Sequence, residues 1–512
     1  MPEQFLHGVE VLELDGGPRP IATVKSAVIG IVGTAPDSEP GVAASLLTGI
    51  VASNNALTWT AKAAGIAGNA ASVALLDPAG NNKALTVSVV DKAVTVSLAT
   101  SDAGAITSTA TDVIAAVAAS APATALLTVA KTAGSSGAGV VTAAAKASLS
   151  GGVDEPFPLN VPTLVAGSRV AAAKLGTTGT LPAAMDAIFD QAGAVVIVVR
   201  VAPGVDEAAT MAAISGGVDG NGKYTGAQAF IGAESLLGFA PRILIAPGFT
   251  HQRPDDLVNV GMKLANPVVS EMIGIAQRLR AVIIADGPNT TDADAIAYAG
   301  DFGSSRVYLV DPWVQRQDAS GAIVLQPGSA VAAGLICYQD NANGFWWSPS
   351  NQTINGIVGV GRPVDFSLGD ASARANLLNE KNVTTIIRQN GFRLWGNRTL
   401  SADPKWAFLS VRRTADIIHD SLLRAHLWAV DRNITKTYIE DVVEGVNAYL
   451  RDLVKIGAIL GGKCWADPDL NSPAQLAAGK AYFDFDFTAP SPAEHITFRS
   501  HMVDDYLKEI FA

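Results

Sequence analysis

The sequence predicts an α/β core with a parallel sheet, an α+β C-terminal domain, and a small β-rich domain inserted into the core. Short apolar runs alternate with helical stretches in residues 161–336, which is typical of a parallel sheet covered by helices. Amphipathic helices and alternating strands follow it, and a segment of different composition precedes it. The predicted parts are an N-terminal arm with the first core strand (1–36), an inserted outer domain (37–155), the α/β core (156–370), the α+β domain (371–490) and a C-terminal arm (491–512).

The inserted segment is distinguished by its composition. Between residues 41 and 152 there is no Arg, His, Glu, Cys, Met, Phe or Tyr, and Trp59 is the only aromatic residue. Alternation of Val or Leu with Thr or Ser predicts a hairpin of Leu85–Val89 and Val94–Leu98, and a helix follows over Ser108–Ala119. A disordered low-complexity linker is the alternative. The regular spacing of Val and Leu favours a folded β-rich domain.

The core is predicted from short runs that are almost wholly apolar, as strands covered on both faces are. Each run stops at a turn that contains Gly or Pro, and helical stretches such as Asp255–Arg280 and Asp292–Phe302 lie between the runs. The runs are Val195–Val199, Arg242–Ala246, Val282–Ala285 and Val307–Val310.

The C-terminal part mixes amphipathic helices with an alternating strand. Val411–Val430 is amphipathic, and Thr437 with Glu440 forms a capping-box pattern at the start of a second helix, which ends at Gly457. Further along, three phenylalanines alternate with two aspartates, which predicts a strand with one solvent-exposed face: Phe483, Asp484, Phe485, Asp486 and Phe487.

The overall composition favours a chain that buries much of its surface against other protein. Charged residues make up 16% of the sequence, against about 25% in ordinary soluble proteins, and the mean hydropathy is +0.28. A large Ala-rich globular protein is the alternative. The net charge of −11 argues against direct binding of nucleic acid.

Targeting and membrane signals are weak. Cys337 and Cys464 are too far apart in the sequence to suggest a disulfide framework, and the first residues lack a secretory pattern, so we expect folding in a reducing cytoplasm. The nearest approach to a membrane span is Val113–Ala130. Alanine dominates it and Pro122 interrupts it, so we expect a small buried helix and a strand, and no stable membrane insertion.

Two aspartates stand where ligands bind in open α/β sheets. Asp286 and Asp311 follow strand ends, where they could hold Mg²⁺ or act as acid–base groups. Both also stand in common turn sequences, which favours a structural role. His251, Asp286 and Ser304 could be drawn as a triad, but nothing local activates Ser304 as a nucleophile.

Other catalytic and ligand-binding motifs fail as well. The chain has no phosphate loop and no G-x-S-x-G elbow, and Gly359–Gly361 lacks the rest of a dinucleotide fingerprint. His419 and His426 would share a helix face, but no third ligand stands near them. The sequence therefore predicts no catalytic residue, no cofactor and no metal site.

The most distinctive segment is GFRLWGNRTLSADPKW, residues 391–406. It combines Trp395 and Trp406 with Arg393 and Arg398, and Trp and Arg commonly anchor protein contacts. The segment resembles the WGNRT signature of the sheath proteins of contractile phage tails and of the related R-type bacteriocins.

The resemblance extends over residues 5–36 and 156–512, nearly everything except the insert. Further blocks are similar to the same family and occur in the same order: FLHGVEVLELDGGPRPI near the start, PRILIAPG from Pro241, ADGPNTTDADAIAYA from Ala285, GFWWSPSNQTINGIVGVGRPVDF from Gly344, WAVDRNITKTY from Trp428 and ADPDLNSPAQLAAGK from Ala466.

The resemblance implies a structural subunit of stacked six-membered rings that surround a rigid tail tube. Such a sheath assembles extended in the host cytoplasm, and its contraction drives the tube through the target envelope. The implied partners are further copies of the chain, the tail tube protein, and baseplate and tail terminator proteins. The implied location is the virion tail, and the implied core is subtilisin-like in outline without protease function. A headless bacteriocin-type particle and a subtilisin-like or metal-dependent hydrolase are the alternatives.

The resemblance also implies that both chain ends act as arms that add strands to a sheet in a neighbouring subunit. The N-terminal arm offers Val9, Val11 and Leu14 between glutamates, and the C-terminal arm offers Ile496 and Phe498 between Thr497 and Arg499. Frayed tails are the alternative. The insert departs from the compact bacteriocin pattern, and we expect it to project away from the tube.

Two further sets of residues are assigned. Arg393, Trp395, Asn397 and Arg398 are expected to form a structural knot, in which Trp395 packs the C-terminal helices and Arg398 pairs with Asp403 or Asp416. Basic residues on or beside the C-terminal helices are candidates for contacts with the tube or with other subunits: Arg412, Arg413, Arg432, Lys436, Arg451 and Lys455. An ordinary solvated helix surface is the alternative for the second set.

Overall fold

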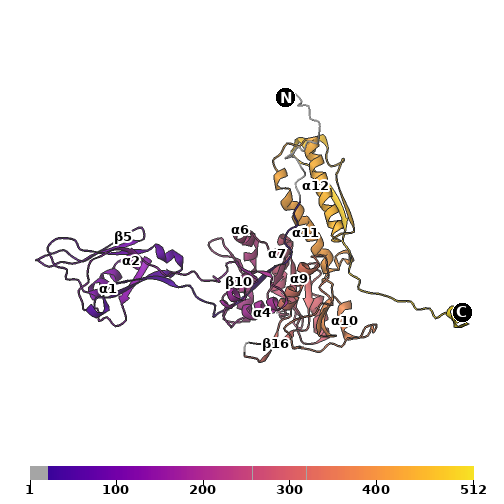
Figure 1. Cartoon of the computed structure of the whole chain (residues 1–512), viewed down its shortest axis with the longest axis horizontal. Coiled ribbons are helices and arrows are strands. Elements are labelled where there is room, and N and C mark those ends of the chain that lie inside the picture. Colours follow the sequence, from indigo (N-terminus) through magenta and orange to yellow (C-terminus); the bar gives the residue numbers. More distant parts are fainter. Residues whose placement is uncertain (1–20, 257, 319, 512) are drawn as a thin grey trace, which may run out of the picture. The chain divides into compact units, whose positions relative to one another are not determined.

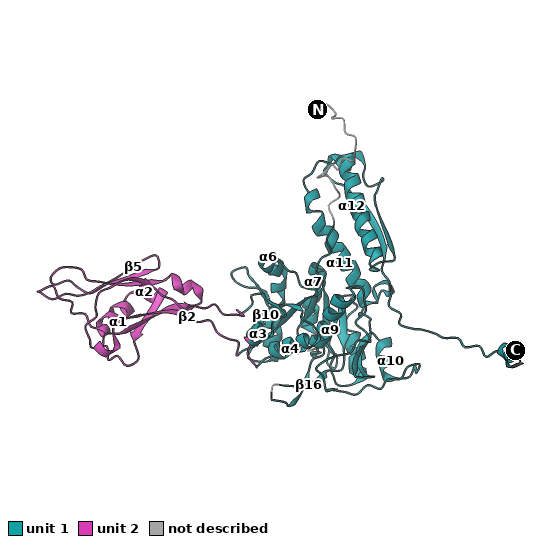
Figure 2. Ribbon diagram, in the orientation of Figure 1, with its two compact units in different colours: residues 1–36, 159–173, 178–512 teal, residues 37–158, 174–177 magenta. Residues whose placement is uncertain are grey.

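The computed structural model describes residues 21–256, 258–318 and 320–511, which form two compact units (Figures 1 and 2). Unit 2 comprises Asp37–Pro158 and Lys174–Thr177. Unit 1 comprises the described residues up to Pro36, Leu159–Ala173, and the chain from Thr178 onward. The chain therefore leaves unit 1 after its first strand and returns to it after unit 2.

Unit 1 is built on an eight-stranded sheet with the spatial order β20 (Phe392–Trp395), β19 (Val383–Arg388), β15 (Val307–Val310), β14 (Val282–Asp286), β13 (Ile243–Ile245), β1 (Val28–Thr34), β10 (Val195–Val201) and β9 (Thr163–Ala166). The six central strands run parallel, and β9 and β20 run antiparallel at the edges. Every residue of β1, β13, β14 and β15 is buried, which is why their sequences are nearly continuous apolar runs. The four runs predicted as parallel strands are confirmed.

Helices surround this sheet (Figure 1). The sheet and helices enclose a core that includes Phe230, Met272 and Tyr298. The helices of this part are α3 (Arg169–Ala173), α4 (Leu181–Gln191), α5 (Glu207–Ser215), α6 (Ala233–Leu237), α7 (Pro267–Leu279), α8 (Asp292–Ala299), α9 (Ser329–Ala342), α10 (Arg374–Glu380) and the 3-10 helix η3 (Gly226–Gly232). Short strands complete it: β11 (Gly217–Val218), β12 (Tyr224–Thr225), β16 (Val314–Gln317), β17 (Ile323–Gln326) and β18 (Gly359–Val360).

The helix predicted over Asp255–Arg280 is shorter than expected, because α7 begins only at Pro267. The Asn266 side chain accepts a hydrogen bond from the N–H of Val269 (3.0 Å), and proline is favoured in a first helical turn, so these two residues fix the start. Before them, Asp255 and Lys263 form an isolated antiparallel bridge across a loop.

The predicted boundary between residues 370 and 371 is wrong for the sheet. Strands β19 and β20 lie beyond it and still belong to the eight-stranded sheet. The buried residues of β19 continue the core next to β15. Sequence periodicity cannot reveal this, because it does not identify which sheet a strand joins.

The C-terminal part of unit 1 has its own apolar core. It is formed by helices α11 (Leu409–Ala425) and α12 (Lys436–Lys455) with the hairpin β21 (Gly461–Ala466) and β22 (Phe483–Thr488). The short helices η4 (Pro404–Trp406), η5 (Leu427–Ala429) and α13 (Pro473–Ala477) lie in the connections. The strand predicted from the alternating phenylalanines is confirmed as β22. Helix α12 is capped by Thr435, whose side chain accepts from the N–H of Tyr438, and not by the predicted Thr437.

Unit 2 is a separate β-rich domain with two sheets. One contains β2 (Ala43–Thr48), β3 (Leu57–Ala64) and β7 (Leu127–Lys131), and the other contains β5 (Thr86–Val90), β6 (Ala93–Ser97), β4 (Ser72–Leu76) and β8 (Ala144–Ser148). Helices α1 (Ala110–Ala119) and α2 (Ala121–Leu126) and the short η1 (Val51–Ser53) and η2 (Ile66–Ala70) complete it.

The local predictions for unit 2 are confirmed in outline. The hairpin forms as β5 and β6. Helix α1 opens with a capping box between Thr109 and Asp112, and Trp59 is fully buried in a core of Val, Leu and Ala. Among the described residues, no helix has the length and the apolar composition needed to cross a membrane.

The last part of the chain contains little regular structure. Residues 489–504 form no helix or strand, and the 3-10 helix η6 (Asp505–Phe511) follows. The alternating piece at Ile496–Phe498 is therefore not a strand in the isolated chain, and these two side chains are 67% and 92% exposed.

Candidate functional site

The carboxyl edge of the parallel sheet is the conventional place for an active site, and Asp286 stands there at the end of β14. Its side chain is fully buried and accepts hydrogen bonds from Ser329 N (2.7 Å), Ser329 Oγ (2.8 Å) and Thr250 Oγ1 (3.0 Å). Burial raises the pKa of Asp286 to about 6, although hydrogen bonds from Ser329, Thr250 and the Gly248 backbone oppose the shift. Because Ser329 begins α9, this carboxylate closes a helix start and is not open to a ligand.

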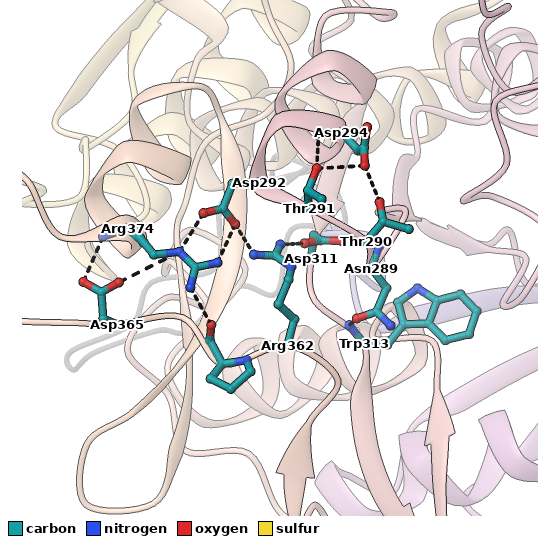
Figure 3. A network of polar contacts seen from close by, with 11 residues as sticks. Asn289, Thr290, Thr291, Asp292, Asp294, Asp311, Trp313, Arg362, Asp365 and Arg374 are labelled. Carbon is teal, nitrogen blue, oxygen red and sulfur yellow. Dashed lines mark hydrogen bonds and ion pairs between the residues drawn. The ribbon is translucent and has the colours of Figure 1, made fainter.

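Asp311, at the end of β15, is held in a network of arginines (Figure 3). It accepts from the backbone N–H of Asn289 (2.7 Å) and pairs with Arg362. Arg362 also pairs with Asp292, and Arg374 donates to Asp292 through its Nε (2.7 Å). Burial raises the pKa of Asp311 against the opposing charge of Arg362, while hydrogen bonding from Arg374 lowers the pKa of Asp292. The network fastens the segment from Arg362 to the start of α10 at Arg374 over the strand ends.

The hypothetical triad does not assemble. The His251 ring packs edge-on against Trp313, with ring centroids 4.8 Å apart, and Ser304 Oγ accepts from the backbone N–H of Arg306 (3.2 Å). Asp286 is bound by Thr250 and Ser329 instead. Within the described parts of the chain, no group of three or more His, Cys, Asp or Glu side chains could hold a metal ion.

The WGNRT segment has internal partners, but they are not all the predicted ones. Arg393 donates to the carbonyls of Asn351 (2.7 Å) and Gln389 (2.9 Å). Trp395 stands edge-on to Phe366 at 4.8 Å and does not belong to the C-terminal core, so the predicted packing on the C-terminal helices is wrong. Strand β20 carries this side chain at the edge of the main sheet, away from that core.

Arg398 pairs with neither predicted carboxylate. Its guanidinium forms a two-point contact with Glu494 (2.8 and 2.5 Å), beyond the last strand. Asp416 is already held by Arg306 and Arg412. Arg398 therefore ties the start of the C-terminal arm to the WGNRT segment. The backbone carbonyl of Asn397, in the same segment, accepts a hydrogen bond from the N–H of Leu409 (2.9 Å).

Two of the six basic candidates are internal. Arg413 is 4% exposed and forms a two-point contact with Asp340, and Arg412 lies between Asp416 and the ring of Trp406. These two side chains are therefore not available for the tube contact predicted for them. The other four lie toward α12 or along it: Arg432 stacks on Trp428, Lys436 approaches Glu440 (3.7 Å), Arg451 pairs with Glu444 (2.5 Å) and Lys455 is exposed.

The sequence reasoning missed the ion pairs that hold α11. Asp416 pairs with Arg306, Asp420 pairs with Arg242, and Arg424 contacts Glu234. The missed signal is the spacing of Asp416, Asp420 and Arg424 at intervals of four, which places them on one helix face.

The chain ends were the other predicted sites. Val9, Val11 and Leu14 lie outside the described residues. The chain after them is anchored in the C-terminal core, because Ile21 and Val24 pack against it and the N–H of Val24 donates to Ser421 Oγ (3.0 Å). At the other end, Ile496 and Phe498 contact solvent, as described above.

The β21–β22 hairpin packs one of its faces against the C-terminal core. Phe485 and Phe487 stack on each other and face the ring of His419 on α11, at 5.8 and 6.1 Å. The alternate residues of β22 lie on the opposite face: Asp484 is half-buried, and Asp486 is exposed and accepts a hydrogen bond from the backbone N–H of Lys463 (2.9 Å). The sheet contains two strands only, so each strand has a second edge without a strand neighbour among the described residues.

These features define a class of protein. The sheet edge where a ligand would bind is filled by the chain's own side chains, whereas Ile496 and Phe498 near the C-terminal end are exposed and the β21–β22 sheet has only two strands among the described residues. The arrangement is that of a structural protein that associates with other chains.

Comparison with known proteins identifies the family. The model of the phage tail sheath protein central domain matches residues 220–400, that of the phage tail sheath C-terminal domain matches residues 401–502, and that of the N-terminal region of tail sheath protein Gp18 domain III matches residues 138–201. The chain belongs to the phage tail sheath protein family, whose members are structural proteins and not enzymes.

Individual relatives agree. A prophage major tail sheath protein of Pseudomonas aeruginosa is 47% identical over 69% of this chain and 88% of its own length. The tail sheath protein of Escherichia phage P2 is 37% identical over 70% and 88%, and that of Burkholderia phage BcepMu is 33% identical over 99% and 98%. The fold is similar to the contracted sheath of the anti-feeding prophage, with a TM-score of 0.51, 20% identity and coverage of 67% of this chain and 89% of that one.

Proposed function

We propose that the chain polymerises into stacked six-membered rings around a tail tube, and that contraction of this sheath drives the tube through a host envelope. The tail tube, baseplate and tail terminator proteins are its partners, the virion tail is its location, and the host cytoplasm is the place of assembly. Family membership supports a sheath subunit. The single observation that supports polymerisation through the arms is the exposure of Ile496 and Phe498 on a segment without regular structure.

Strand exchange fits the physical requirements of contraction. A strand added to a sheet edge is held by main-chain hydrogen bonds, and its alternate side chains enter pockets. Such a joint lets subunits swing as rigid bodies while they remain connected. Among the described residues, the outer edge of β22 has no strand neighbour and can accept a strand, whereas the Asn447 side chain on α12 bonds the backbone of Cys464 on the other edge. The ion pairs around α11 join the C-terminal helices to the rest of unit 1. We also propose that the core is subtilisin-like in outline.

The phage is favoured over a headless particle. The alignment with the BcepMu sheath spans 99% of this chain, whereas those with the phage P2 and Pseudomonas prophage proteins span 70% and 69%. The sheath protein of a phage therefore aligns with this chain over the insert as well. The insert is proposed to be an outer domain that projects away from the tube.

Removal of residues 1–20 tests the proposal. The truncated chain should unfold at the temperature of the full chain, because the described residues keep their cores, yet it should form no cylinders in negative-stain electron micrographs. Cylinders of normal length and diameter from this truncated chain would contradict assembly through the N-terminal arm.

The basic side chains near α12 are proposed to contact the tube or another subunit. Lys436 and Arg451 are 89% and 63% exposed, so reversal of their charge should not unfold the protein. Lys436→Glu and Arg451→Glu should weaken assembly or contraction, and the loss should be smaller at high salt because salt screens exposed charges. Unchanged assembly and firing in both variants would leave these residues as ordinary surface.

A further inference from the structure

A short loop of unit 1 presents apolar side chains to solvent. It comprises residues 258–264, between β13 and α7, and we call it the apolar loop. Its alternate residues are apolar and are 87%, 95%, 62% and 47% exposed: Val258, Val260, Met262 and Leu264. A single exposed apolar residue is ordinary, but four of them on one loop indicate a contact site.

The conformation of the apolar loop is fixed by backbone and polar groups. The N–H of Asp256 donates to the carbonyl of Met262 (2.9 Å), and the Asn259 side chain donates to the Asp256 carboxylate (2.7 Å). Just before them, Arg253 donates two hydrogen bonds of 2.6 Å to Asp301. A loop that is held in this way before it binds loses less conformational entropy on binding.

Another part of unit 1 contains a cleft of about 570 Å³. It lies between the segment that leads into β1, the residues that lead into β13, and the end of α11. Sites that enclose a few apolar groups have volumes of roughly 300–1,000 Å³, so the cleft has room for several side chains. Much of its lining is apolar: Val24, Val28, Phe239 and Ala240.

The cleft also has a positive charge without a counter-charge. Its two arginines, Arg242 and Arg424, both pair with Asp420. The Lys25 ammonium lies 4.6 Å from the centre of the Phe239 ring and forms no ion pair with a described residue. The cleft therefore favours an apolar group that carries a negative charge beside it.

The apolar loop and the residues before it have the opposite excess of charge. Residues 255–264 contain two acidic residues, Asp255 and Asp256, and one basic residue, Lys263. Lys263 pairs with Asp255 (2.6 Å), while hydrogen bonds from Asn259 hold the pKa of Asp256 below its ordinary value. Asp256 consequently stays ionised, and the loop is complementary to the cleft in both its apolar surface and its charge.

The apolar loop and the cleft lie at opposite edges of the main sheet. Residues 238–242 of the cleft lead into β13, so they lie at the amino edge of the parallel strands. The apolar loop follows β13 and lies at the carboxyl edge, where α7 begins. A loop therefore does not reach the cleft of its own chain. Two complementary surfaces at opposite ends of one chain form a head-to-tail contact, which repeats from copy to copy.

We infer that the apolar loop of one subunit enters the cleft of a neighbouring subunit, with Val258 and Val260 against Phe239 and with Asp256 on the side of Lys25. The inference rests on the proposed function, because it adds a contact between the unit 1 parts of adjacent sheath subunits. This contact joins two fixed surfaces and uses neither chain end.

Disulfide trapping between two singly substituted full-length chains tests the assignment. Chains with Val260→Cys and chains with Ala22→Cys, an exposed residue of the cleft, are assembled together, oxidised mildly and analysed on a non-reducing gel. The native Cys337 and Cys464 are buried and do not compete for the new thiols.

Two matched controls lie at the same two sheet edges but outside the proposed contact. Val205 follows β10 at the carboxyl edge and is 99% exposed, so Val205→Cys is the control for the apolar loop. Val170 follows β9 at the amino edge and is 80% exposed, so Val170→Cys is the control for the cleft.

We expect covalent dimers from Val260→Cys with Ala22→Cys, and few from either pair that contains a control. Equal yields from the control pairs, or cylinders without the expected dimer, would overturn the inference. The helix η6 of another copy is the rival occupant, because its Ile510 is 68% exposed. Dimers of Ile510→Cys with Ala22→Cys, in place of those from Val260→Cys, would assign the cleft to η6 instead.

Removal of the apolar side chains provides a second readout. Val258→Ser combined with Val260→Ser should raise the chain concentration needed to form cylinders by about tenfold or more, because two apolar side chains leave the contact. The unfolding temperature should not change, since both side chains are exposed in the isolated chain. Val205→Ser is the matched control and should assemble normally.

Assembly of the double variant at the normal concentration would contradict the contact. If the unsubstituted chain formed no cylinders at all, the proposed function itself would fail, which separates the two failures.

Discussion

The strand ends of the main sheet and the free edge of the β21–β22 hairpin form an instructive contrast. At the strand ends, Asp286 and Asp311 are fully buried, and serine, threonine and arginine side chains of the same chain occupy their oxygens. At the hairpin, the outward backbone groups of Phe485 have no hydrogen-bond partner outside the hairpin in the part of the chain that the structure describes. Buried polar groups must find hydrogen-bond partners within the chain, whereas exposed polar groups are bonded to water and can later pair with another chain. The contrast agrees with the proposal that the hairpin takes part in assembly, while the strand ends contribute to the stability of the fold.

The largest expected effect is on assembly and comes from the exposed C-terminal arm. Removal of residues 495–512 should abolish cylinder formation in negative stain, because these residues supply the exposed arm. The unfolding temperature should change by no more than about 2 °C, since the truncation removes no residue of a described core. Cylinders from this chain, or its failure to fold, would break the contrast.

The next largest effect is on stability and concerns an ion pair buried within the chain. Arg413→Ala should lower the free energy of unfolding by about 3–5 kcal/mol, because it leaves the buried carboxylate of Asp340 without its partner. Urea unfolding monitored by circular dichroism measures this loss. The matched control is Arg451→Ala, whose ion pair with Glu444 is exposed and should contribute less than about 1 kcal/mol. Equal losses in the two variants would contradict the internal role of Arg413.

A pH-dependent effect of similar or smaller size is expected at Asp286. Its pKa is raised by burial to about 6 in the folded chain, from 3.8, so the folded state binds this proton more tightly than the unfolded state. The stability that protonation gives is present below about pH 4 and is lost as the pH rises through 6, by up to about 3 kcal/mol.

Asp286→Asn removes this titration. The difference in unfolding free energy between the unsubstituted chain and the variant should therefore change between pH 4 and pH 7, while both chains still assemble. A difference independent of pH would show that Asp286 has an ordinary pKa. A stable, folded variant unable to form cylinders would give the strand ends a role in assembly.

The smallest effect on assembly is expected from unit 2. Deletion of residues 42–152 should leave cylinders of unchanged inner diameter, because unit 2 has its own core and the main sheet does not use its strands. Loss of cylinders from a chain whose unit 1 still unfolds cooperatively would place unit 2 in the lattice.

The sequence predicted the parallel strands and β22 because each depends on local burial: strands buried on both faces are continuous apolar runs, and a strand with one exposed face alternates apolar and polar residues. It also predicted a structural role in turns for Asp286 and Asp311, whereas the structure gives them partners distant in sequence: Thr250 and Ser329 for Asp286, and Asn289 and Arg362 for Asp311. It placed the start of α12 at Thr437, two residues late, because Thr435 has no acidic residue three positions on to complete the capping-box pattern, yet its hydroxyl caps Tyr438.

The sequence by itself determined the family and whether each region is α/β, α+β or β-rich. Local periodicity and the order of motifs can be read from the sequence without knowing which distant residues are in contact. Only the tertiary structure decided the partners: Arg398 with Glu494, Arg413 with Asp340, Trp395 with Phe366. It also decided that the Asn447 side chain bonds the backbone of Cys464 on one edge of the hairpin, while the other edge has no strand neighbour among the described residues. These partners lie from 17 to 96 positions apart in the sequence and belong to different elements. No local sequence pattern encodes which of many possible long-range pairs will form.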